Sequence, residues 1–353
     1  MPSGFSFEAD NAFGPVMDSG CRDGFDFTLL FEQATFGLIP AVAFLLLSPV
    51  RLQSLAKCEV RIQFNRLRSA KLTTIFAFAA IQLALLISWA QNAKPYTKIS
   101  VASGAVNLAV AMVILVLSWM EDERSVRPSS LLAIYLFFTL LFDIVQTRTL
   151  WLARGRAGSL IPSLFTASVA IKTWMLLLES LGKRKYLTGT YRGLPLERTS
   201  GILDRSLKWW LNRLFHAGFR SLLTVSDLNV LDKPLESAGA ARKTQRAWVQ
   251  RQRPERRFES PLVVFPRLCM MGFTFAQPFL ITSMLSRLDD PHAVMNDGYG
   301  LIGATIVIYL GIAISTLSYN HMLNRFTTIF RGAGSSMIYD HALRIPDGRL
   351  EDR

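Results

Sequence analysis

Residues 99–119 read ISVASGAVNLAVAMVILVLSW, a stretch of 21 residues without one charged side chain. A helix of about 20 apolar residues is long enough to cross the hydrocarbon core of a bilayer. Six further runs of similar character accompany it along the chain, at residues 28–50, 72–90, 129–147, 158–181, 261–285 and 299–320. Because lipid offers no partner to free backbone N–H and C=O groups, such spans must be helical. We therefore expect an all-α, polytopic membrane protein with about seven transmembrane helices.

The basic residues fall mainly on one side of the predicted membrane. With the N-terminus placed outside, the segments 51–71, 120–128, 182–260 and 321–353 are inside and carry 30 of the 39 lysines and arginines, against 7 in the outside segments. Cytoplasmic segments are enriched in Lys and Arg, although long loops follow this rule weakly. Without residues 182–260 the split is still 13 to 7. We therefore predict an outside N-terminus and a cytoplasmic C-terminus.

The spacing of the runs divides the chain into four parts. Residues 1–27 form an acidic extracytoplasmic tail, and residues 28–181 hold five closely spaced runs that we expect to form a compact five-span module. Residues 182–260 form a basic cytoplasmic linker, and residues 261–353 hold the last two runs. Such a chain is an integral, multi-pass protein, and its composition leaves the plasma membrane and the vacuolar membrane equally open.

A few polar residues and prolines interrupt the five-span module. Charges inside a bilayer are costly and often mark a function. We favour a simpler interpretation, in which Glu32 and Asp143 reach the outer headgroups and Lys172 extends inward or bonds a neighbouring helix. Pro40 and Pro162 fall inside the first and fifth runs, where the missing N–H predicts a kink.

Residues 200–223 of the linker are amphipathic at the helical period. The apolar side of this predicted helix carries Leu203, Leu207, Trp210, Leu211 and Leu214, and the rest is rich in Arg, Lys, Asn and His. An apolar face with tryptophan and a basic back is typical of a helix that lies in the membrane interface. A helix packed on a soluble domain is the alternative. We favour the interface, which makes membrane lipids a partner.

The end of the linker, residues 241–257, carries seven basic residues and one Glu. A basic segment can bind nucleic acid. A basic segment just before a span more often faces anionic lipid, however, and Trp248 is its one aromatic residue. We therefore expect no nucleic-acid partner.

The sixth and seventh runs contain few groups that suggest chemistry. Phe273, Gln277 and Phe279 place a polar point in an aromatic helix, which either lines a pathway for amphipathic substrates or serves helix–helix contact. The four histidines have no metal-ligand spacing, so neither a catalytic nor a metal site is expected. After the seventh run, residues 319–345 keep a helical pattern, which predicts that this helix continues into the cytoplasm.

Several stretches resemble a known family, the fungal multidrug-resistance-type ATP-binding-cassette (ABC) exporters of subfamily C. CRDGFDFTLLFEQATFGLIPA (Cys21–Ala41) resembles the family's entry into its first span, and PRLCMMGFTFAQPFLI (Pro266–Ile281) resembles the first span of its transporter core. Residues Ser200–Asp232 are similar to its linker helix, Gly298–Ser315 to the next core span, and Arg331–Ile345 to its first intracellular loop. The resemblance covers nearly the whole chain.

The resemblance implies export of small molecules such as drugs or secondary metabolites, driven by ATP in two nucleotide-binding domains. Those domains need a G-x-x-x-x-G-K-[ST] loop to hold the phosphates. The one Gly-Lys pair here, Gly182-Lys183, is followed by Arg184, and Leu177 stands where the first glycine belongs. We therefore expect the front part of such an exporter, truncated before the nucleotide-binding domains, with no cofactor and no ATP hydrolysis of its own. In the implied coupling loop, Arg331, Tyr339 and Arg344 would contact a nucleotide-binding domain supplied elsewhere.

Two other functions remain open at this stage. The five-span module could bind another membrane protein or direct trafficking without any transport. Seven spans with an outside N-terminus also outline a seven-span receptor, although topology alone does not determine function. The exit from the third run reads Glu121-Asp-Glu-Arg124 and the seventh run contains no proline, both of which disfavour the receptor.

Overall fold

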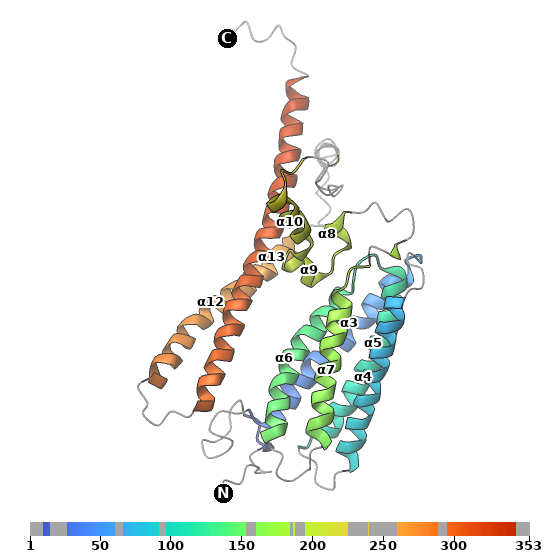
Figure 1. The fold of residues 1–353 in the computed structure, drawn as a ribbon, viewed down its shortest axis with the longest axis vertical. Coiled ribbons are helices and arrows are strands. Elements are labelled where there is room, and N and C mark those ends of the chain that lie inside the picture. Colours follow the sequence, from blue (N-terminus) through green and yellow to red (C-terminus); the bar gives the residue numbers. More distant parts are fainter. Residues whose placement is uncertain are drawn as a thin grey trace. The chain divides into compact units, whose positions relative to one another are not determined.

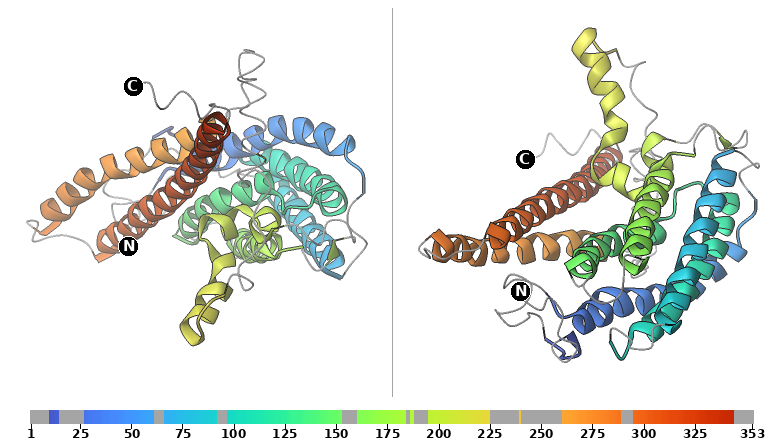
Figure 2. Two further views of the ribbon diagram at one scale, coloured as in Figure 1. Left: turned by 90° about the horizontal axis from the view of Figure 1, so that it is seen from above. Right: turned by 60° about the horizontal axis from the view of Figure 1, so that its bottom comes forward.

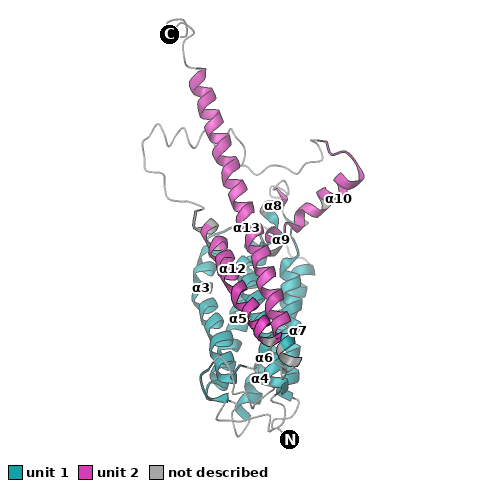
Figure 3. Cartoon of the chain, turned by 90° about the vertical axis from the view of Figure 1, so that its left-hand side faces the viewer, with its two compact units in different colours: residues 1–193, 199–204, 294–300 teal, residues 194–198, 205–293, 301–353 magenta. Residues whose placement is uncertain are grey.

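The computed structural model describes residues 10–14, 27–60, 66–91, 97–152, 160–183, 186–187, 195–224, 239, 260–288 and 295–343. In this part of the chain, seven helices are long and apolar enough to cross a membrane. All seven coincide with the predicted runs, so the all-α, polytopic fold is confirmed. The chain divides into two compact units, coloured separately in Figure 3, and each is described by itself.

The first unit contains the five-helix bundle. It begins with the short helix α2 (Leu29–Phe31) and the π-helix η2 (Glu32–Leu38), which continue into α3 (Ile39–Ala56). The other four helices are α4 (Arg66–Gln91), α5 (Ser100–Arg124), α6 (Ser130–Leu152) and α7 (Leu160–Ser180). They lie side by side, and consecutive helices run in opposite directions (Figure 1; Figure 2). We call the end where α7 leaves for the linker the linker end, and the opposite end the far end.

Apolar side chains fill the bundle in two clusters. The larger joins α3, α4, α5, α6 and α7, and its buried members are Ala41, Phe44, Leu55, Ile75, Phe78, Val110, Ala111, Ile114, Leu117, Leu132, Tyr135, Leu136 and Met175. The smaller lies toward the far end and contains Leu29, Leu85, Trp89, Leu150 and Ile161. Within lipid, such packing brings van der Waals contact rather than shielding from water, so close fit between helices holds the bundle together.

The two prolines expected to kink helices behave differently. Pro40 stands in the first turn of α3, directly after the seven-residue π-helix. Because proline cannot donate to the backbone ladder and its ring crowds the carbonyl four residues earlier, a wider local turn relieves both problems. Pro162 lies in the first turn of α7, where an N–H has no helical partner in any case, so this proline removes no backbone hydrogen bond from the helix.

The last two long helices are α12 (Ser260–Leu288) and α13 (Met295–Ala342), and the second unit contains α12 and α13 from Leu301 onward. Among the described residues, side chains of the two helices meet. The ring of Phe273 lies against Gly311, where an added Cβ would stand 2.5 Å from it. The Arg267 guanidinium lies 5.2 Å from the centre of the Tyr319 ring. With 48 residues, α13 far exceeds the roughly 20 that a bilayer needs, which confirms that this helix continues beyond the seventh span.

The linker does not form the single helix predicted over residues 200–223. It contains α8 (Leu196–Thr199), α9 (Ile202–Ser206), the 3₁₀ turn η5 (Trp209–Leu211) and α10 (Asn212–Arg220). The break lies at Lys208, whose φ of 53° is left-handed. A left-handed residue turns the chain out of a right-handed helix. The sequence could not predict this break, because glycine and asparagine, and not lysine, usually adopt the left-handed conformation.

Candidate functional site

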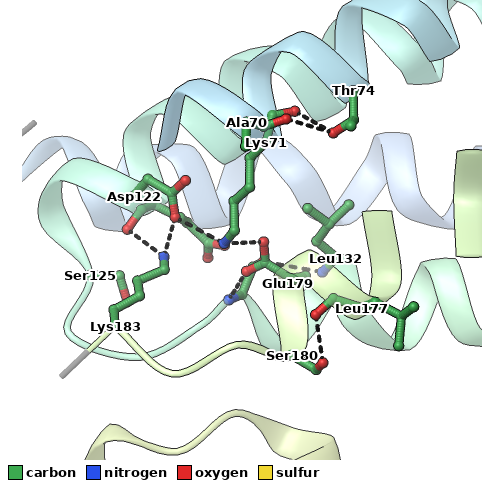
Figure 4. A network of polar contacts seen from close by, with 12 residues as sticks. Ala70, Lys71, Thr74, Asp122, Ser125, Leu132, Leu177, Glu179, Ser180 and Lys183 are labelled. Carbon is green, nitrogen blue, oxygen red and sulfur yellow. Dashed lines mark hydrogen bonds and ion pairs between the residues drawn. The ribbon is translucent and has the colours of Figure 1, made fainter. Parts of the chain in front are cut away.

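A buried network of charges joins three helices at the linker end of the bundle (Figure 4). The Lys71 Nζ of α4 donates to Glu179 Oε2 of α7 at 2.7 Å and to Asp122 Oδ1 of α5 at 3.2 Å. All three side chains are at most 6% exposed. One ammonium therefore holds two carboxylates from different helices, in a place that water hardly reaches.

The network extends to the first residues after α7 and to α3. Lys183 forms an ion pair with Asp122 and donates to the Glu121 carbonyl oxygen. Arg51 of α3 donates to Glu121 Oε1 at 2.7 Å, and the Ser129 N–H donates to Glu179 Oε1 at the same distance. The cations Arg51, Lys71 and Lys183 thus face the anions Glu121, Asp122 and Glu179, so the network is neutral as a whole.

Such a network has a physical cost and a structural effect. Removing an ion from water costs several kcal/mol, and attraction between partners offsets this only when the geometry is good. A cation left without its anions would be much worse, so the helices are stable only when these partners meet. We therefore infer that the network specifies which helices pair and in what register, and that it marks where the linker begins.

A second ion pair lies deeper in the bundle. Lys172 of α7 pairs with Asp143 of α6, both buried, and the Lys172 ammonium lies 5.6 Å from the centre of the Phe78 ring. At the far end, Thr149 Oγ1 donates to Glu32 Oε1 at 2.7 Å, and Glu32 has no exposed surface. The expectation that Glu32 and Asp143 reach the headgroups was therefore wrong. Lys172 does bond a neighbouring helix, which confirms one of the two alternatives predicted for it.

A small cavity beside the network is lined by Lys71, Ser118, Glu179 and apolar residues that include Ile75, Leu132 and Leu136. Its empty volume of about 200 Å³ includes open solvent, so the enclosed space is far smaller than the roughly 300 Å³ at which small-molecule pockets begin. Within the described residues, no group of three or more His, Cys, Asp or Glu is placed to hold a metal ion. The geometry of the module is thus that of a packed helical element.

The predicted residues of α12 do not share one face. Phe273 and Gln277 are four positions apart, so they lie on one side of the helix, where Phe273 meets α13. Phe279 is 76% exposed and lies well away from that side at 100° per residue. Helix contact therefore accounts for Phe273, and a pathway that uses all three residues stays a prediction.

The predicted linker residues are spread over the three short helical pieces. Leu203 falls in α9, Leu207 just after it, Trp210 and Leu211 in η5, and Leu214 in α10. Around them, large apolar side chains are left uncovered in the described chain, among them Trp209 at 68%, Phe215 at 64% and Phe219 at 89% exposed. The interfacial role stays a prediction, now carried by the shorter helix α10.

Of the coupling residues, Arg331 and Tyr339 are exposed on α13. Arg344 lies outside the described residues, and so does the basic segment 241–257. Their expected roles are untested.

Reasoning from the sequence missed the network at the linker end. A signal was present, because acidic residues stand at the ends of the third and fifth runs on the side that is otherwise basic. Glu121, Asp122 and Glu179 oppose the positive-inside pattern, and anions there need cations close by. Lys71 and Lys183 were counted among the inside charges without being paired with them.

Comparison with known proteins shows what the chain is similar to. Residues 9–160 match the ABC transporter TMD0 domain. The chain is 36% identical to ABC multidrug transporter lscH of Purpureocillium lilacinum over 95% of its length, and 39% identical to ABC multidrug transporter B of Aspergillus fumigatus over 92%. It is also 37% identical to ABC-type transporter FG02316 of Gibberella zeae over 96%.

These relatives are much longer than the chain, which spans 23% of the first two and 24% of the third. The matched domain covers α2 to α6 and ends where α7 begins. Nearly all of this multi-pass membrane chain is thus similar to fungal ABC multidrug transporters, and its residues 9–160 match the TMD0 domain of ABC transporters.

Proposed function

We propose that this chain supplies the accessory five-span module, the linker and the first helix pair of an ABC-type exporter of small molecules. It exports drugs or secondary metabolites only when nucleotide-binding domains complete it. The observation that carries this proposal is the similarity of 92–96% of the chain to fungal transporters that are about four times as long. The names of two of these relatives include multidrug transport.

The two units differ in a way that supports completion by further helices. In the five-span module, 28–39% of each span window is buried. In α12 and α13 the share is 6%, with large apolar side chains such as Phe275, Ile306 and Leu310 exposed. Lipid can cover such faces, but two isolated helices enclose no route for a substrate. We infer that the rest of a transporter packs on α12 and α13.

The chain is proposed to contribute no catalytic chemistry. ATP and Mg²⁺ would act only in nucleotide-binding domains. Arg331 and Tyr339, toward the C-terminal end of α13, would contact those domains. The module and α10 would meet membrane lipids, and no nucleic acid would take part.

Complementation in a yeast strain without its own efflux pumps tests this function. The chain would be expressed alone, together with ABC multidrug transporter B lacking the quarter that matches it, and with the full transporter as the reference. We expect efflux of a fluorescent dye only when both parts are present. Efflux from the chain alone, or equal efflux from the shortened transporter alone, would contradict the proposal.

A partner-binding function without transport is the second candidate, because the five-helix bundle has its own core and its own charge network. A tagged pull-down with and without residues 1–181 separates the two. Partners lost only on deletion of these residues, in cells where complementation yields no efflux, would favour this function.

A further inference from the structure

The linker helix α8 is attached to α13 by one carboxylate. Glu197 Oε1 accepts from Arg325 Nη1 at 2.5 Å and lies 3.1 Å from His321 Nε2. His321 and Arg325 are four residues apart on α13, so they project from one face of that helix. The three side chains are 13–19% exposed, which shields the contact from most solvent screening.

The charge state of Glu197 suits this contact. The hydrogen bond with His321 and the charge of Arg325 lower the pKa of Glu197 to about 2, although partial burial opposes them. The carboxylate is therefore ionised throughout the neutral range and remains able to accept from both partners. Hydrogen bonds between charged groups are roughly twice as strong as neutral ones.

The contact closes a very long loop. Glu197 is 124 residues from His321 and 128 from Arg325 in the chain. The loop contains residues 198–259 of the linker and all of α12, and α12 itself touches α13 through Phe273 and Arg267. The linker therefore leaves from a point fixed on α13 and returns to a helix that is also held against α13.

We propose that Glu197 is a latch that makes residues 198–259 a closed side loop and attaches α13 to the five-span module through residues 184–196. Lys183 is held in the module by Asp122, so the path from the module to α13 is 14 residues long with the latch closed. With the latch open, the path runs from Lys183 to Ser260, which is 77 residues. Opening the latch therefore lengthens the chain path that joins them from 14 to 77 residues. This inference does not depend on the proposed transport function.

Cleavage of the linker in the intact chain tests the latch. A specific protease site would be inserted after residue 240, and the purified protein would be cut in mild detergent. An N-terminal affinity tag would then recover residues 1–240, and the amount of the α12–α13 fragment recovered with it would be measured. A closed latch predicts that this fragment remains bound although the covalent linker is cut.

Charge reversal distinguishes the latch from general adhesion. We expect Glu197→Arg to lower recovery of the α12–α13 fragment at least about tenfold, the change expected from losing one charged hydrogen bond. Glu197→Gln, which keeps the shape, should lower it less. The double variant Glu197→Arg with Arg325→Glu should restore recovery, and Asp340→Arg, a reversal elsewhere on α13, should leave it unchanged.

Each other outcome overturns the proposal. Separation of the fragments in the cut wild-type chain would show that Glu197 does not hold them. Full recovery with Glu197→Arg would show that other contacts do. Loss of recovery that the double variant fails to restore, while Glu197→Gln behaves as wild type, would show that the arginine disturbs the linker rather than opening a latch.

Discussion

Lys71 shows how one residue of an apolar bundle can determine how its neighbours pair. Its ammonium contacts carboxylates of two other helices, and all three side chains are nearly inaccessible. The sequence could predict that charges occur at this end of the bundle, but it could not pair them. Pairing depends on the rotation of each helix about its own axis, which side-chain packing determines and composition does not.

Removal of the Lys71 charge should therefore destabilise the module strongly. Lys71→Met leaves Glu179 and Asp122 without a shared cation, and loss of one partner from a buried pair costs about 3–5 kcal/mol. The free energy of unfolding of the purified chain, measured by denaturant titration of its helicity, checks this. Lys57→Met is the control, because Lys57 is exposed near the same end of the bundle and should change stability by less than about 0.5 kcal/mol. Equal effects of the two variants would refute the role of the network.

Gly311 makes a separate prediction about the contact of α12 with α13. A methyl group at this position would stand 2.5 Å from the Phe273 ring, so Gly311→Ala should destabilise by about 1–3 kcal/mol through overpacking. Gly303 has nothing within 4 Å of an added Cβ, so Gly303→Ala should instead stabilise α13 by about 0.5–1 kcal/mol. Thermal unfolding midpoints should move in opposite directions. Phe273→Leu combined with Gly311→Ala should recover part of the loss, and its failure to do so would place the strain elsewhere.

At the scale of elements, the sequence predicted which helices exist better than where they end. The third run was expected to stop at residue 119, yet α5 continues to Arg124, and α4 begins six residues before its run, at Arg66. Charged residues lower the apolar character of a run, but in the folded chain Arg68 pairs with Glu123 between these two helices. The extra turns are thus stabilised by contacts that no single run contains.

In the linker, the sequence predicted helical segments but not the break between them. Apolar periodicity over residues 200–223 indicated correctly that helical segments occur there, but it carries no information on the left-handed Lys208 that separates them. The sequence likewise did not predict the π-helix before Pro40, although the proline indicated that the helix is irregular there. Backbone irregularities of this kind arise from tertiary packing, which overrides local preference.

The membrane contact proposed for α10 can be tested by its two faces. Phe215 lies on the apolar side and Arg220 on the opposite side, and both are exposed. In cysteine-free chain reconstituted into anionic vesicles, a spin label at Phe215→Cys should collide mainly with oxygen, which concentrates in lipid. A label at Arg220→Cys should collide mainly with a water-soluble nickel reagent. Equal accessibility of both labels to the nickel reagent would show that α10 does not lie in the interface.

For the whole molecule, composition was enough to identify a seven-span membrane protein, because so many apolar runs have no other environment. The similarity to ABC transporters came from particular stretches rather than from composition, and it was confirmed by the TMD0 match and by relatives along nearly the full chain. The orientation in the membrane rests on the charge distribution alone.

The native cysteines offer a direct check of that orientation. A variant that keeps only Cys21 should react with a membrane-impermeant maleimide in intact cells, because the N-terminal tail is predicted to be outside. A variant that keeps only Cys58, just after α3, should react only after the membrane is permeabilised. The reverse pattern would invert the predicted topology and place the linker and the end of α13 outside the cell.

The length of α13 has a mechanical consequence. Gly311, where α12 touches it, is 31 residues from the end of the helix at Ala342. At 1.5 Å per residue this is about 46 Å, so a tilt of about 5° pivoting at Gly311 would swing the helix end by about 4 Å. A small change in packing around the Phe273 ring would thus move the end of α13 by more than the roughly 3 Å length of a hydrogen bond.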